Sequence, residues 1–125
     1  MKTMTTTEVA ARFNELAQQE KWFEIQDELF ADDVTSSEPD GSPYFAPMQK
    51  AEGKDAVRKK GENWVAKVEE FHGANTTQPV IGGNFFAVGR GFDITVSGFG
   101  RIKIEQLMMY EVRNGKIASE RFFYQ

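Results

Sequence analysis

The 125-residue sequence contains no cysteine and a single histidine, His72. The missing cysteines exclude disulfides and thiolate metal sites, and one histidine leaves too few ligands for an ordinary zinc site. Basic residues are in the minority, 15 against 19 acidic ones, for a net charge of -4. We therefore expect neither nucleic acid nor an anionic membrane as a partner, because both bind basic surfaces.

Long apolar segments are also missing from the sequence. No apolar run approaches the roughly 20 residues of a membrane-spanning helix. Residues 1–4 lack the apolar core of a signal peptide. We accordingly expect a cytoplasmic protein that needs neither a metal nor an organic cofactor.

Aromatic residues, in contrast, are abundant. The chain has 11 Phe, 3 Tyr and 2 Trp, which together make up 13% of its residues. Such a number exceeds what a small core needs. It indicates either a phenylalanine-rich core or a concave apolar cavity that binds a ligand.

Apolar residues at helical spacing predict three helices in the N-terminal half of the chain. The first begins after Thr5, whose hydroxyl can cap the helix together with Glu8. The second covers residues 21–30 and the third covers residues 54–71.

The remaining segments alternate with a period of two, which is typical of strands. The loop over residues 40–53 is long enough to be a lid rather than a connector. Glycines punctuate the C-terminal strands and predict a strongly curved sheet. The expected strands cover residues 34–38, 73–81, 84–97, 101–112 and 117–124.

This order, helices first and antiparallel strands after them, favours the α+β class. We expect three N-terminal helices packed in the concave face of a strongly curved, mixed or antiparallel sheet. Such a cone encloses a hollow that suits a ligand.

Four segments carry a resemblance to a known family. They are Phe30-Ala31-Asp32-Asp33-Val34, Glu38-Pro39, Gly53-Lys54-Asp55-Ala56-Val57 and Met109-Tyr110-Glu111-Val112-Arg113-Asn114-Gly115-Lys116-Ile117. In order and spacing they resemble the SnoaL-like branch of the nuclear-transport-factor-two-like superfamily, whose members have a cystatin-like α+β fold. The match spans nearly the whole chain and implies a single SnoaL-like domain over residues 1–125. The superfamily includes ketosteroid isomerases, polyketide cyclases, epoxide hydrolases, dehydratases and members without catalysis, so the fold alone does not give the function.

The resemblance implies roles for particular residues. Ketosteroid isomerases place their general base at the end of the first strand, where this chain has Glu38. Their two oxyanion donors fall at Phe13 and close to Met108, neither of which can donate a hydrogen bond, so steroid isomerisation is not expected. SnoaL-type polyketide cyclases use an acid on the closing strands, and Glu120 is the nearest equivalent here.

The closing hairpin, with Asn114-Gly115 at its tip, can form in two registers. With a two-residue turn, Val112 pairs with Ile117, and Arg121 shares the face of Tyr110. With a three-residue turn bulged at Gly115, the register slips by one residue and every side chain changes face. We favour the bulged form, because the resemblance places the alternate set inside. The residues then expected inside are Ala118, Glu120, Phe122 and Tyr124, and those expected outside are Leu107, Met109, Arg121 and Phe123.

Arg90 is the one charged residue in an otherwise apolar row of its strand. A buried guanidinium needs a carboxylate partner or a bound anion. We consider Glu38 or Glu120 as that partner, a ligand anion, or a surface position reached through a bulge at Gly89 and Gly91.

These observations predict a protein with an apolar pocket for a hydrophobic, ring-containing small molecule with a polar handle. The outward apolar side chains predict a homodimer. If the protein is an enzyme, Glu38 and Glu120 act as acid and base in a cofactor-free cyclisation, isomerisation or dehydration. The alternative is a non-catalytic binding or dimerisation module. The expected substrate-binding residues are Phe13, Tyr44, Trp64, Phe86, Arg90, Gln106, Met108, Tyr110, Phe122 and Tyr124.

Overall fold

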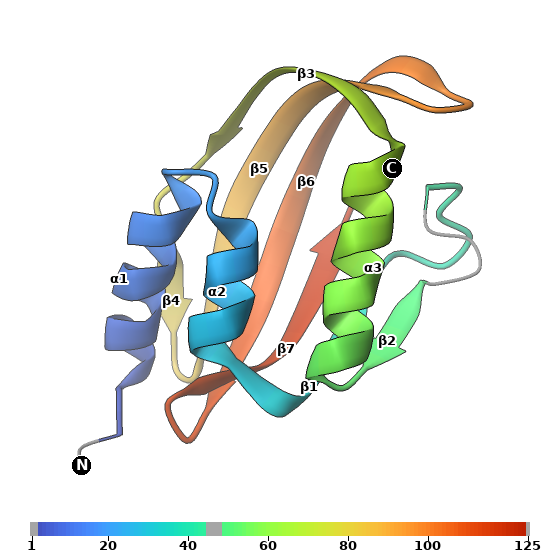
Figure 1. Cartoon of the computed structure of the whole chain (residues 1–125). Coiled ribbons are helices and arrows are strands. Elements are labelled where there is room, and N and C mark those ends of the chain that lie inside the picture. The colour runs from blue at the N-terminus through green and yellow to red at the C-terminus, as the bar shows by residue number, and fades with distance from the viewer. Residues whose placement is uncertain (1–2, 45–48, 125) are drawn as a thin grey trace.

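The computed structural model describes residues 3–44 and 49–124. Three helices lie on one face of a curved sheet (Figure 1), which confirms the predicted α+β architecture. The elements in chain order are α1 (Thr6–Ala17), α2 (Trp22–Leu29), β1 (Phe30–Ser37), β2 (Lys50–Glu52), α3 (Lys54–Lys67), β3 (Val68–Thr76), β4 (Val80–Gly82), β5 (Phe85–Val96), β6 (Gly100–Arg113) and β7 (Lys116–Phe123). No helix in the described ranges is long and apolar enough to cross a membrane.

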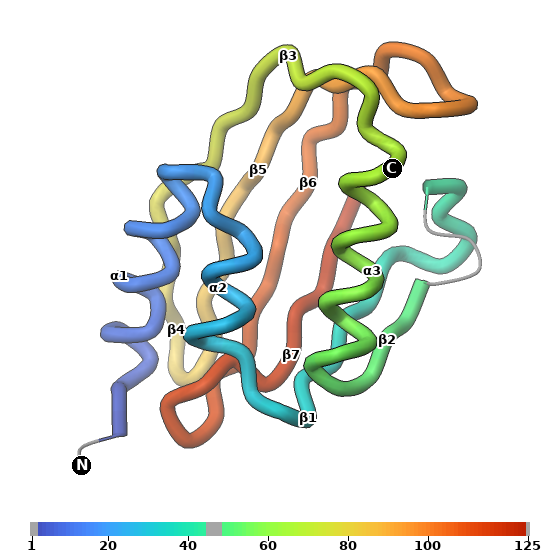
Figure 2. Tube along the Cα trace, in the orientation of Figure 1, coloured from blue at the N-terminus to red at the C-terminus, as the bar shows by residue number. Residues whose placement is uncertain are grey.

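The sheet is mixed and strongly bent. Its strand order is β2-β1-β7-β6-β5-β3. The short strand β4 also pairs with β5, on a different stretch of that strand from β3. The pairing of β1 with β7 is parallel, whereas the other pairings are antiparallel. The long strands β5 and β6 arch toward the C-terminal end of α3 (Figure 2), so the sheet and the helices face each other across a hollow.

Local chemistry fixes the ends of the helices. The Thr5 hydroxyl accepts a hydrogen bond from the Glu8 amide, and the Glu8 carboxylate accepts one from the Thr5 amide, which completes the predicted capping box of α1. Glu20 adopts the left-handed conformation, with φ of 58°, in the turn that separates α1 from α2. Gly53, with φ of 91°, precedes α3 in a conformation that favours glycine.

Several element boundaries differ from the predicted ones. The third helix ends at Lys67 rather than at residue 71, because Val68 already pairs with Val96 in the sheet. Pairing with a neighbouring strand thus overrides helical spacing at this end of the helix. The first strand begins at Phe30, and the strand expected over 73–81 is divided between β3 and β4.

The predicted lid over residues 40–53 is partly a strand. β2 pairs with the end of β1, so this part of the segment is fixed to the sheet. Residues 45–48 of the predicted lid lie outside the described residues.

The closing hairpin reaches the favoured register by a different route. Asn114 and Gly115 both have positive φ and form a two-residue turn between Arg113 and Lys116, so the predicted bulge at Gly115 is wrong. The extra residue is instead Ala118, which lies between the pairs Val112–Ile117 and Glu111–Ser119. Beyond this bulge Glu120 pairs with Tyr110 and Phe122 with Met108, which confirms the predicted inward positions of Glu120 and Phe122.

An aromatic cluster forms the centre of the core. Phe13 of α1 packs against Phe86 and Tyr110, with ring centroids 5.1 and 4.7 Å away, and these two rings stack on each other at 5.1 Å. All three side chains are fully buried. This cluster anchors α1 to the sheet and forms the wall behind the hollow.

Candidate active site

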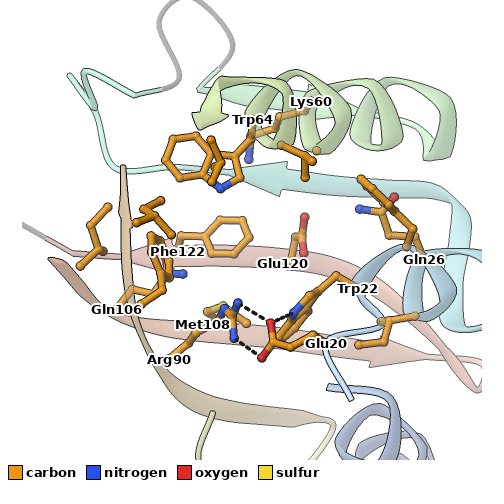
Figure 3. A pocket seen from close by; sticks show the side chains of 18 of the residues that line it. Glu20, Trp22, Gln26, Lys60, Trp64, Arg90, Gln106, Met108, Glu120 and Phe122 are labelled. Carbon is orange, nitrogen blue, oxygen red and sulfur yellow. Dashed lines mark hydrogen bonds and ion pairs between the residues drawn. The ribbon is translucent and has the colours of Figure 1, made fainter. Parts of the chain in front are cut away.

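A cavity of about 830 Å³ lies between α2, α3 and the concave face of the sheet. This volume lies within the ordinary range of small-molecule sites. Apolar and aromatic side chains dominate its lining (Figure 3). The sequence-predicted residues that line the cavity are Glu38, Tyr44, Trp64, Arg90, Gln106, Met108, Tyr110, Glu120, Phe122 and Tyr124.

Two predicted lining residues, Phe13 and Phe86, do not reach the cavity. Both are buried in the aromatic core behind Trp22 and Tyr110, which do line it. The spacing in the sequence correctly placed Phe13 and Phe86 on inward faces. The structure assigns them to the core, since other rings lie between them and the hollow.

The two predicted catalytic carboxylates are buried in one hydrogen-bonded network. Lys60 of α3 donates to Glu38 Oε2 at 2.6 Å and to Ser36 Oγ at 2.9 Å. The Ser36 hydroxyl in turn donates to Glu120 Oε1 at 2.8 Å. Tyr124 donates to the other oxygen of Glu38, Oε1, at 2.7 Å. This network ties the end of β1 to α3 and β7.

The two carboxylates have different roles in the network. Glu38 has both oxygens engaged, one by the Lys60 ammonium and one by the Tyr124 hydroxyl. For Glu120, in contrast, Ser36 is the one hydrogen-bond partner among the described residues, and it contacts a single oxygen. Every buried polar side-chain atom among the described residues has a hydrogen-bond partner, so the unpartnered second oxygen of Glu120 is not buried. Because Glu120 lines the cavity, this oxygen faces the hollow.

Burial raises the pKa of Glu120 from 4.5 to about 7, and the nearby charge of Glu38 adds to this effect. The Lys60 ammonium and the Ser36 hydroxyl act in the opposite direction but do not cancel the cost of burying the charge. Glu120 can therefore both give and take a proton near neutral pH. Burial also raises the pKa of the Tyr124 phenol, which keeps this group a hydrogen-bond donor.

Arg90 has a partner that the sequence did not predict. Its guanidinium donates to both oxygens of Glu20, at 2.8 and 3.1 Å, and to Thr76 Oγ1 at 3.1 Å. It also lies over the ring of Trp22, 4.5 Å from the centroid. The predicted pairing with Glu38 or Glu120 is wrong, because the carboxylate partner of Arg90 is Glu20. The solvent-exposed alternative is also wrong, because only 11% of the Arg90 side chain is exposed.

Sequence reasoning missed Lys60 and Ser36, although a signal for each was present. Lys60 is three residues after Val57 and four before Trp64, so helical spacing places it on the buried side of α3. Ser36 is two residues before Glu38 and therefore shares its face of the strand. A lysine on an apolar helix face indicates a buried partner of opposite charge.

Comparisons with known proteins agree with this fold. The family model of the SnoaL-like domain matches residues 4–124. A crystal structure from Mesorhizobium loti, described as a candidate SnoaL-like polyketide cyclase with carbohydrate phosphatase as a second description, is 35% identical. The alignment covers 97% of this chain and 100% of that one, with a TM-score of 0.89.

More distant structures share the fold alone. A protein with a cystatin-like fold from Xanthomonas campestris is 16% identical over 97% of this chain and 91% of that one, with a TM-score of 0.77. A candidate isomerase from Bacillus subtilis is 15% identical over 98% and 90% of the two chains, with a TM-score of 0.70. No curated protein matches the sequence. On the family match and the similarity to the Mesorhizobium loti protein, this chain belongs to the SnoaL-like domain family.

Proposed function

We propose that the protein binds a hydrophobic, ring-containing small molecule and that Glu120 transfers a proton to or from it. The observation that carries this proposal is a buried carboxyl with a pKa of about 7 and one oxygen facing a large apolar cavity. Enzymes tune carboxyl groups to such values for general acid–base catalysis near neutral pH. The reaction class is a cyclisation, isomerisation or dehydration, each of which requires moving a proton on the substrate.

The chemistry of the lining supports a planar ring system as the ligand. Trp64 and Phe122 line the cavity near Glu120 (Figure 3). Trp22 and Phe92 also line it and lie against the Arg90 guanidinium. Aromatic side chains favour flat apolar ligands, because rings stack or pack edge to face. The name of the Mesorhizobium loti relative, a SnoaL-like polyketide cyclase, is consistent with such a substrate.

In the proposed reaction Glu120 serves as a proton shuttle. Its carboxylate takes a proton from a carbon next to a carbonyl group, and the resulting acid returns that proton to a second site on the substrate. The negative charge that develops on the carbonyl oxygen is stabilised by the positive charge of Lys60, which lines the same cavity. Glu38 and Ser36 hold Lys60 in place and are positioning residues. This assignment modifies the predicted acid–base pair, because both oxygens of Glu38 are already engaged.

A second candidate is non-catalytic binding in the same cavity. Phe13 and Met108 stand where the resemblance places the oxyanion donors of ketosteroid isomerases, and neither can donate a hydrogen bond. A binding protein would keep the cavity and lose such donors.

The two candidates are separated by a ligand screen followed by a kinetic comparison. Ring-containing ketones and phenols are screened by thermal shift, since a ligand that binds the native state raises the melting temperature. Hits are then incubated with the wild-type protein, with Glu120→Gln and with Glu62→Gln, which changes an exposed glutamate of α3. Proton transfer by Glu120 predicts a roughly 10²-fold or larger loss of turnover in Glu120→Gln, with turnover retained in Glu62→Gln. Binding without turnover by the wild-type protein supports the non-catalytic candidate instead.

The homodimer and the cytoplasmic location remain predictions. Leu107 and Phe123 pair across β6 and β7 on the outer face of the sheet, where 44% and 42% of each residue is exposed. Light scattering after size-exclusion chromatography measures the oligomeric state, and a monomer contradicts the prediction.

A further inference from the structure

We infer that the ligand of this cavity carries a carboxylate, which Arg90 binds in exchange for Glu20. This inference rests on the proposed function, because it names the polar handle of the ring-containing ligand. It is carried by a shielded arginine in the cavity wall whose counter-ion comes from an exposed turn.

Arg90 is built as an anion-binding group. Its guanidinium lies over the rings of Trp22 and Phe92, 4.5 and 5.6 Å from their centroids, and only 11% of the side chain is exposed. Gln106 pairs with Arg90 across β5 and β6 and lines the same part of the cavity. An arginine fork presents two parallel N–H groups, which match the two oxygens of a carboxylate.

Glu20 already occupies this fork as a ligand carboxylate would. Both of its oxygens accept from Arg90, and Oε1 also accepts from the indole N–H of Trp22 at 2.9 Å. The Glu20 carboxylate is nevertheless open to exchange, because 40% of its side chain is exposed to solvent. Its backbone φ of 58° is also unfavourable for a residue other than glycine. A carboxylate entering with a ring system can replace Glu20, which then turns outward into solvent.

The register of the sheet sets the length of the ligand. Arg90 pairs with Gln106, and Glu120 pairs with Tyr110, so the two positions are four residues apart along β6 and two strands apart across the sheet. These spacings correspond to about 17 Å between their Cα atoms on a flat sheet. Both side chains extend into the cavity and shorten this distance (Figure 3). The flat-sheet value is an upper limit because this sheet is bent, and a molecule of two rings falls within it, with its carboxylate at Arg90 and its reacting carbon near Glu120.

The test compares an acid with its uncharged analogue of the same shape. Biphenyl-4-carboxylate and biphenyl-4-carboxamide are titrated into the protein at pH 8, and tryptophan fluorescence reports binding because Trp22 and Trp64 both line the cavity. We expect the acid to bind several-fold more tightly than the amide. In Glu20→Gln the acid gains roughly tenfold in affinity while the amide changes little, because the competing carboxylate is gone.

Arginine variants and a matched control complete the design. Arg90→Met removes the preference for the acid, and Arg90→Lys, which keeps the charge but not the fork, retains part of it. Circular dichroism verifies that each variant is folded. The control is Asp93→Asn, which breaks an ion pair of the same two-point geometry with Arg101 outside the cavity and leaves both affinities unchanged.

The outcomes separate this inference from the proposed function. If both probes bind equally and Glu20→Gln changes neither, the carboxylate inference is overturned while the apolar cavity stands. A preference for the acid that survives Arg90→Met also overturns it, since the anion then binds elsewhere. Failure of both probes to bind any folded variant contradicts the inference and the proposed function together.

Discussion

Replacing Lys60 with methionine is expected to destabilise the fold strongly. The ion pair of Lys60 with Glu38 is 2.6 Å long, and its side chains are 5% and 2% exposed. Without Lys60, the Glu38 carboxylate keeps one hydrogen bond, from Tyr124, and remains shielded from water. Breaking a buried pair in this way costs about 3–5 kcal/mol of the free energy of unfolding, because an uncompensated charge stays buried.

Most of this cost should disappear when Glu38 is neutralised as well. In the double variant Glu38→Gln/Lys60→Met no charge of the pair remains, so we expect it to be more stable than Lys60→Met. The double-mutant cycle then gives a favourable coupling free energy of about 2–3 kcal/mol. Urea titration followed by tryptophan fluorescence measures all four proteins.

An exposed ion pair supplies the control. Arg12 and Glu28 also approach to 2.5 Å, but their side chains are 37% and 46% exposed. Solvent screens such pairs, so Arg12→Met is expected to lower stability much less than Lys60→Met. Equal effects of the two substitutions, or additive effects within the cycle, would refute the argument from burial.

Three other variants test separate parts of the structure. Glu120 has a pKa of about 7 when folded against 4.5 ordinarily, so its contribution to stability is present below pH 4.5 and is lost as the pH rises to 7. The difference in unfolding free energy between wild type and Glu120→Gln should therefore fall by about 3 kcal/mol over that window, and urea titrations giving a constant difference would contradict this. Gly115→Ala should lower the free energy of unfolding by about 1–2 kcal/mol in the same assay, because φ is 76° and the added Cβ lies 2.7 Å from Thr3 Cγ2. Its control is Gly82→Ala, whose added Cβ meets nothing within 4 Å. Tyr124→Phe should lower the free energy of unfolding by about 1–2 kcal/mol, because Glu38 loses a hydrogen bond. An unchanged urea midpoint would argue against that bond.

The closing hairpin shows how far local signals reach. Asn114-Gly115 correctly predicted a turn, since both residues adopt the positive φ that a two-residue turn needs. The bulge that sets the faces lies three residues further on, at Ala118, where Ile117 and Ala118 are buried in succession. A strand is predicted from strict alternation of apolar and polar residues. A bulge interrupts this alternation, so the sequence shows it only as two consecutive buried residues.

The polar contacts of the cavity were harder to predict because they join distant segments. Glu20 and Arg90 are 70 residues apart in sequence, and Ser36 and Glu120 are 84 apart. Periodicity placed Arg90 in an apolar row, the resemblance placed Glu120 inside, and both residues line the cavity. Neither signal carries information on which element lies opposite. The parallel pairing of β1 with β7 brings Ser36 next to Glu120, and the turn between α1 and α2 brings Glu20 to Arg90.

A buried carboxyl that exchanges its proton near neutral pH is the chemical basis of the proposed function. Carbon-13 NMR of glutamate-labelled protein measures it directly, with the Glu120 signal assigned by its absence in Glu120→Gln. We predict a titration midpoint for Glu120 near pH 7, set by burial against the opposing effects of Lys60 and Ser36. A midpoint near the ordinary value of 4.5 would mean that water reaches the carboxylate, and would contradict its role as a proton shuttle.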